Sequence, residues 1–136
     1  MDKTLIALLP FFGVVTGAFL QYIFTNLRER QSQKKQLKIK AYADYALAAA
    51  ELSSRDKNMH AMARVKLTDA KVRIAIYGSE QVVKYIADFD RNGANLANFE
   101  GKKRFIKIIK TMRAENKKDN VTHEDFAQVL FSSDLT

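Results

Sequence analysis

The chain has 136 residues, a formal net charge of +8 at pH 7, one proline, five glycines and neither cysteine nor tryptophan. So few prolines and glycines argue against a turn-rich β fold and favour helices. The absence of cysteine suits a reducing compartment.

An uncharged and mostly apolar stretch occupies residues 4–24 (TLIALLPFFGVVTGAFLQYIF). A helix of that length, at about 1.5 Å per residue, spans the roughly 30 Å hydrocarbon core of a bilayer. No small-residue cleavage site follows it, which argues against a signal peptide. We therefore expect a transmembrane anchor over residues 1–25, in a bacterial inner membrane.

The polar segment 26–36 and the residues after it are rich in cations, whereas only Lys3 precedes the apolar stretch. The positive-inside rule then predicts a single-pass protein with its N-terminus outside and its C-terminal domain in the cytoplasm. The cations of this juxtamembrane helix are candidates for contact with anionic lipid headgroups. They are Arg28, Arg30, Lys34, Lys35, Lys38 and Lys40.

Gly13 and Gly17 form a Gly-x-x-x-Gly pair inside the apolar stretch. Two glycines on one helix face leave a flat patch that a second helix can approach closely. The pair predicts a helix-packing site and a homo-oligomer, with neutral lipid-facing residues as the alternative.

Apolar residues spaced by threes and fours predict helices over most of the remaining chain. The first continues from the apolar stretch to Ser53, where Ser53-Ser54 begins a break. The others are expected at about residues 56–77, 80–91 and 95–116, with a short last helix after Thr122. The predicted fold class is all-α, an N-terminal transmembrane helix continuing into a small antiparallel helical bundle over residues 37–136, one compact domain.

The second predicted helix carries two apolar stripes, which suggests a central helix with neighbours on both sides. One stripe contains Met59, Ala63, Leu67, Ala70, Ile74 and Tyr77, and the other contains Val65, Val72 and Ile76.

Capping residues mark the ends of these helices. Gly78 is expected in the left-handed conformation after the second helix, with Ser79 as the N-cap of the third. The third helix should end at Asn92-Gly93, and Thr122 with Asp125 resembles a capping box.

The chain resembles a set of small, poorly characterised bacterial single-pass membrane proteins with a cytoplasmic helical domain. The matching features are a Tyr-x-x-Tyr in the first soluble helix and a Gly-Ser turn. They comprise Tyr42, Tyr45, Tyr77, Gly78, Ser79, Val82 and Val83. The resemblance covers most of residues 5–85 and implies no activity.

Residues 88–93 (DFDRNG) match the first half of a calcium-binding EF-hand loop. The position that needs a bidentate glutamate holds Phe99, and Glu100 comes one residue late. We therefore expect no metal site here, only a helix that ends at an Asn-Gly cap.

A basic surface is possible on the fourth predicted helix, at Lys102, Lys103, Arg104, Lys107 and Lys110. Cations continue to Lys118, and Glu115 is the only acid among them. Three interpretations remain open, namely a solvated helix with a core-facing side, an anionic-membrane contact and a nucleic-acid contact. Nucleic acid ranks third because no aromatic residues are evidently placed for base stacking.

No nucleophile–base pair, phosphate loop or dinucleotide fingerprint is found, so we expect no enzyme, no catalytic residue and no cofactor. The predicted function is a non-enzymatic, membrane-anchored helical module that binds a protein partner or itself. The alternatives are a small oligomeric effector that perturbs or permeabilises the membrane, and a tether of nucleic acid to the membrane.

Overall fold

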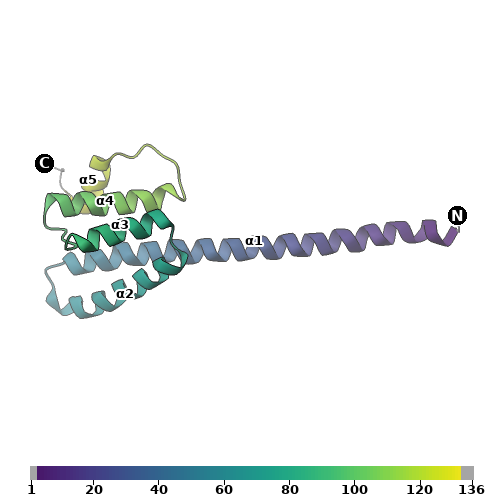
Figure 1. Cartoon of the computed structure of the whole chain (residues 1–136), viewed down its shortest axis with the longest axis horizontal. Coiled ribbons are helices and arrows are strands. Elements are labelled where there is room, and N and C mark those ends of the chain that lie inside the picture. Colours follow the sequence, from purple (N-terminus) through teal and green to yellow (C-terminus); the bar gives the residue numbers. More distant parts are fainter. Residues whose placement is uncertain (1–2, 133–136) are drawn as a thin grey trace. The chain divides into compact units, whose positions relative to one another are not determined.

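The computed structural model describes the backbone of residues 3–132 and the side chains of residues 13–132. Within this range the regular elements are all helical, which confirms the predicted all-α class (Figure 1). They are α1 (Lys3–Ser53), the short 3₁₀ helix η1 (Lys57–Met59), α2 (His60–Tyr77), α3 (Glu80–Arg91), α4 (Phe99–Ala114) and α5 (His123–Phe131).

The chain divides into two compact units, residues 1–36 and residues 37–136, with the boundary inside α1. In the first unit, the side chains of residues 13–36 are exposed apart from the partly exposed Asn26. A Cβ atom added to Gly13 or Gly17 would meet nothing within 4 Å. No contact in the described chain therefore occupies the predicted glycine face.

The predicted membrane anchor is wrong. Among the residues that the structure describes, no helix combines the length and the apolar character needed to cross a membrane. The side chains of residues 4–12 lie outside the described residues.

The inner-membrane location and the N-out orientation rested on that anchor and are corrected with it. The membrane-effector and membrane-tether alternatives also required the anchor and are not retained. The cations at residues 28–40 likewise lose the bilayer argument that made them candidates for lipid contact.

The second unit is a helical bundle in which successive helices alternate in direction (Figure 1). Long-range pairs show the same antiparallel arrangement. Glu51 near the end of α1 pairs with Lys66 near the start of α2, and Tyr42 of α1 contacts Glu115 just after α4. Helix α5 packs on α4.

Aromatic rings fill the centre of the bundle. Phe105 of α4 lies between Tyr45 of α1 and Phe89 of α3, with ring centroids 6.3 and 5.9 Å away. Ile74 of α2 joins the same cluster. Tilted rings at such distances add specific contacts to the apolar area that they bury.

Most of the predicted helix ends are confirmed. The Ser79 hydroxyl accepts a hydrogen bond from the Val82 N–H as the N-cap of α3. Gly93, with φ +87°, follows the end of α3. Thr122 and Asp125 form the predicted capping box at α5.

Two helices begin later than predicted because side chains upstream cap other backbone groups. Asp56 caps η1 by accepting from the Asn58 N–H, so α2 starts only at His60. The Asn98 side chain accepts from the Gly101 N–H at 2.7 Å, which places the start of α4 at Phe99.

The predicted left-handed conformation of Gly78 is wrong. Its φ of −71° and ψ of 161° are extended values that any residue adopts. The glycine is needed for space instead, because an added Cβ would lie 2.5 Å from the Ile74 carbonyl oxygen.

Candidate interaction surface

The outer face of α2 exposes a stripe of large apolar side chains. Met62, Val65, Val72 and Ile76 are 63%, 65%, 54% and 65% exposed. Their spacing places them along one side of the helix. We call this set the α2 stripe.

The middle of the opposite side of α2 is buried, as the sequence predicts, but Met59 and Tyr77 at the ends of that predicted stripe are 45% and 37% exposed. Ala63, Ala70 and Ile74 are at most 2% exposed, and Leu67 packs against the main core. The small alanines let α2 approach its neighbours closely. The sequence also predicted a neighbour for the second apolar face, and within the described residues that neighbour is missing. The prediction that α2 has packed neighbours on both sides is therefore wrong for the single chain, because Val65, Val72 and Ile76 are exposed.

Ion pairs hold the cations of α2. Lys66, beside the α2 stripe, pairs with Glu51 of α1 at 3.1 Å, and Lys71, on the side that faces α3, pairs with Asp90 at 2.7 Å. A third cation on α2, Arg73, contacts two carboxylates.

The Arg73 guanidinium lies 2.8 Å from the carboxylate of Asp44 and 2.6 Å from that of Asp69. The hydrogen bond that Arg73 donates to Asp44 is the main reason that the pKa of Arg73 is raised. The apolar stripe is therefore bordered by charges that are largely balanced within the bundle, the composition expected of an interface rim.

A polar network built on Glu115 fixes the geometry of the bundle at one end. The Lys38 ammonium lies 2.8 Å from the Glu115 carboxylate, and the Tyr42 hydroxyl donates to it at 3.1 Å. The Ser79 hydroxyl donates to the same carboxylate, and the Ser79 N–H donates to the Tyr42 oxygen at 3.1 Å. We call these four residues the Glu115 network. It joins α1, the turn before α3 and the end of α4.

The electrostatics of the network favour an ionised Glu115. Partial burial by itself raises the pKa of the carboxyl, but hydrogen bonds from Lys38, Ser79 and Tyr42 and the Lys38 charge outweigh it, so the pKa is lowered. Burial is also the main reason that the pKa of Tyr42 is raised. Tyr42 is therefore a neutral donor to a charged acceptor, which strengthens the hydrogen bond.

The sequence analysis did not predict the Glu115 network, although signals for it were present. Glu115 is the only acid in a basic stretch, and Tyr42 and Ser79 belong to the two features that carry the family resemblance. The fold brings those two features into hydrogen-bond contact. Its hydrogen bonds join three parts of the bundle, so the network acts as a structural clamp.

Most cations of the predicted basic surface on α4 already interact with acidic or aromatic side chains of the same chain. Arg104 pairs with Asp88 at 2.6 Å. The ammonium groups of Lys102, Lys103 and Lys107 lie 5.4, 6.0 and 4.2 Å from the ring centroids of Phe131, Phe99 and Tyr85. In each of these cation–π contacts the ammonium group already interacts with an aromatic ring of the same chain. Lys110 is partly exposed.

The predicted lipid-contact residues fall into two groups. Lys38 lies within the Glu115 network, so its charge is used inside the bundle. Arg28, Arg30, Lys34, Lys35 and Lys40 are exposed along α1.

The partial EF-hand motif does not form a metal centre in the described chain. Arg104 donates to the Asp88 carboxylate, and Lys71 donates to the Asp90 carboxylate, so each carboxylate is paired with a cation of the chain. Among the described residues, no cluster of three or more metal-type ligands is present. His60 contacts the Ser54 carbonyl oxygen at 2.8 Å, a local contact after the end of α1.

No protein-family model matches the chain, and neither the curated proteins nor the solved structures contain a significant match. The resemblance to small bacterial single-pass proteins therefore stays a prediction.

Proposed function

We propose that the bundle is a non-enzymatic interaction module that binds a protein partner, or a second copy of itself, through the α2 stripe. The observation that supports this is the exposure of four large apolar side chains on one face of a helix whose other face is packed. Large apolar side chains exposed along one face of a folded protein are typical of an interaction site. Thr68 and Asp69 lie among them, between Val65 and Val72.

The surroundings of the α2 stripe support the same function. The stripe lies on a regular helix held from behind by Ala63, Ala70 and Ile74, so binding requires little rearrangement. Lys66 and Arg73, which border the stripe, already have acidic partners within the bundle. An apolar partner face therefore meets no unpaired charge from these two side chains, and burying such charges is costly.

Site-specific photo-cross-linking in the full chain tests the proposal. A photoreactive phenylalanine analogue placed at Val72 should give a covalent adduct with a protein of defined mass. The same analogue at Val129 of α5 is the matched control, because Val129 is also an exposed valine on a helix, at 82%. We expect adducts from position 72 and none from position 129.

A charge substitution provides the second half of the test. Val65→Lys should abolish the adduct formed at position 72, because it places an ammonium in the middle of the stripe, while the circular dichroism spectrum stays unchanged. An adduct of twice the mass of the chain identifies self-association, and any other defined mass identifies a foreign partner. Equal labelling from positions 72 and 129, or no adduct at position 72, would refute the proposal.

A further inference from the structure

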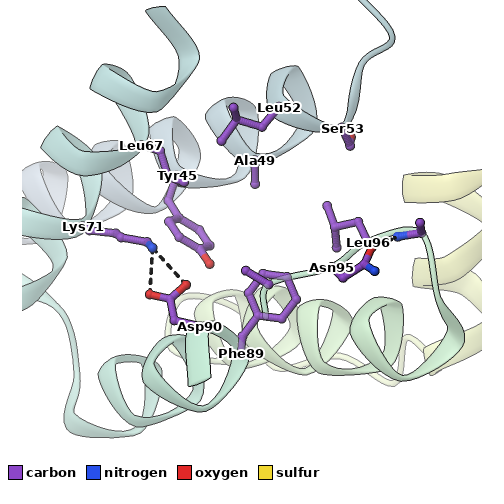
Figure 2. Close-up of a pocket in the computed structure, with 12 residues that line it drawn as sticks. Tyr45, Ala49, Leu52, Ser53, Leu67, Lys71, Phe89, Asp90, Asn95 and Leu96 are labelled. Carbon is purple, nitrogen blue, oxygen red and sulfur yellow. Dashed lines mark hydrogen bonds and ion pairs between the residues drawn. The ribbon is translucent and has the colours of Figure 1, made fainter. Parts of the chain in front are cut away.

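A cavity of about 340 Å³ that is partly open to solvent lies between helices of the bundle, away from the α2 stripe (Figure 2). It is bounded by the end of α1, the middle of α2, the end of α3 and the loop before α4. Leu52, Leu67, Phe89 and Leu96 supply apolar walls. The size and the apolar lining fall within the range of small-molecule sites.

Tyr45 gives the cavity a directional polar group. The residue is 1% exposed, and its hydroxyl makes no hydrogen bond within the described chain. Figure 2 shows the ring directed from α1 toward the space between Asp90 and Leu96. No buried side-chain polar atom of the described residues lacks a partner, so the Tyr45 oxygen is still reached by solvent although the ring is buried. The hydroxyl is therefore a free donor, and the acceptor of a ligand can take the place of water there.

A second donor lies on the opposite side of the cavity. The Asn95 side-chain oxygen already accepts from the Ala97 N–H at 2.8 Å. Asn95 is exposed at the mouth of the cavity, so its amide nitrogen is open to solvent and can donate to a ligand. The Tyr45 hydroxyl and this nitrogen together offer two hydrogen-bond donors to the same space.

The charged groups at the cavity compensate each other. Lys71 donates to both carboxylate oxygens of Asp90, at 2.9 and 2.7 Å. A ligand carboxylate would be repelled by the Asp90 carboxylate, and a ligand cation would be repelled by the Lys71 ammonium. Burial and the nearby Asp90 charge raise the pKa of Tyr45, so its hydroxyl stays protonated at neutral pH. A neutral ligand suits this balance best.

We propose that this cavity binds a small neutral molecule with an apolar body and one carbonyl oxygen, which accepts hydrogen bonds from Tyr45 and Asn95. The carbonyl replaces water at the two donors, and the apolar body covers the leucine and phenylalanine walls. This site is independent of the interaction proposed for the α2 stripe.

Titration of the full chain with three matched probes tests the proposal. Acetophenone carries the carbonyl, ethylbenzene lacks it, and benzoate carries a charge in its place. Amide chemical shifts in nuclear magnetic resonance spectra report both the affinity and the location. We expect acetophenone to bind most tightly, with shifts at residues 45–53 and 89–97.

The Tyr45→Phe variant separates a specific site from a packing defect. It should fold normally, because the hydroxyl makes no hydrogen bond that folding would lose. We expect the Kd for acetophenone to rise about three- to tenfold, the usual effect of losing one hydrogen bond, and the Kd for ethylbenzene to stay unchanged.

Filling the cavity supplies a further control. Ala49→Leu should abolish binding of all three probes, and Ala97→Phe serves the same purpose from the loop if the first variant fails to fold. The proposal is overturned if no amides around the cavity shift, if ethylbenzene or benzoate binds as tightly as acetophenone, or if Tyr45→Phe leaves the preference for acetophenone intact.

Discussion

Glu115 is the residue through which three parts of the bundle are connected. Its carboxylate accepts from Lys38, Tyr42 and Ser79, which come from α1 and from the turn before α3. Each of these partners is at least 36 positions away in sequence. The residue therefore stabilises a tertiary arrangement and not only a local turn.

The first prediction concerns the charge of this carboxylate. Glu115→Gln keeps the size of the side chain and removes its charge. We expect the free energy of unfolding at pH 7 to fall by about 1–3 kcal/mol, because hydrogen bonds to an ionised group contribute more than neutral ones. Urea denaturation of the wild type and the variant measures the difference.

The pH dependence of that difference provides the control. The pKa of Glu115 in the folded state lies below its ordinary value of 4.5. The stabilisation is then fully present above about pH 4.5 and is lost as the pH falls through the folded-state pKa. The gap between wild type and Glu115→Gln should narrow on acidification. A constant gap would show that the charge contributes nothing.

At the scale of elements, the turn between α2 and α3 depends on a close approach. The Gly78 N–H donates to the Ile74 carbonyl oxygen at 2.7 Å, and α3 begins at Glu80 immediately after the Ser79 cap. A side chain at position 78 would have to enter the space between the last turn of α2 and this turn.

The second prediction is that Gly78→Ala destabilises the bundle by about 1–3 kcal/mol, the usual range for overpacking a tight site. The cost comes from the position of the new Cβ, 2.5 Å from a backbone oxygen and 2.9 Å from the Ile74 methyl carbon. Thermal unfolding followed by circular dichroism measures it. Gly17→Ala is the matched control, because the same Cβ there meets nothing within 4 Å. An unchanged melting temperature for Gly78→Ala would mean that the turn opens without cost.

At the scale of the whole molecule, the described core belongs entirely to the second unit. Every buried apolar residue with a described side chain lies between Ala41 and Ala127, and the Glu115 network begins at Lys38. The first unit contributes none of these contacts.

The third prediction is that residues 37–136 fold without the first unit. The fragment should unfold in one cooperative transition, with the same midpoint and the same dependence on urea as the bundle in the full chain, because it retains the whole described core. Circular dichroism on both proteins makes the comparison. A fragment with helical signal but no cooperative transition would show that residues 1–36 stabilise the bundle.

Much of the local structure could be predicted from the sequence. The bounds of α3, the Ser79 cap and the Thr122–Asp125 capping box are as predicted. These features depend on side chains that bond to backbone groups two or three residues away. The start of α4 was misplaced because Asn95 and Asn98 are both plausible caps, and only Asn98 caps the helix.

The candidate sites were less accessible to sequence reasoning. The two stripes of α2 look alike as patterns, and the choice between them depends on which face meets α1 and α3. Tyr42 and Tyr45 illustrate the same limit. Both are buried tyrosines three positions apart on α1, yet one hydroxyl bonds to Glu115 and the other faces the cavity.

The sequence by itself determined the helical class, most helix ends and the set of apolar residues available for a core, because these follow from interactions between residues within a turn or two. The tertiary structure decided which face of α2 stays exposed, which groups surround Glu115 and where the packing leaves a cavity beside Tyr45. Those outcomes depend on contacts between residues distant in sequence, whose side chains meet only when the helices pack together.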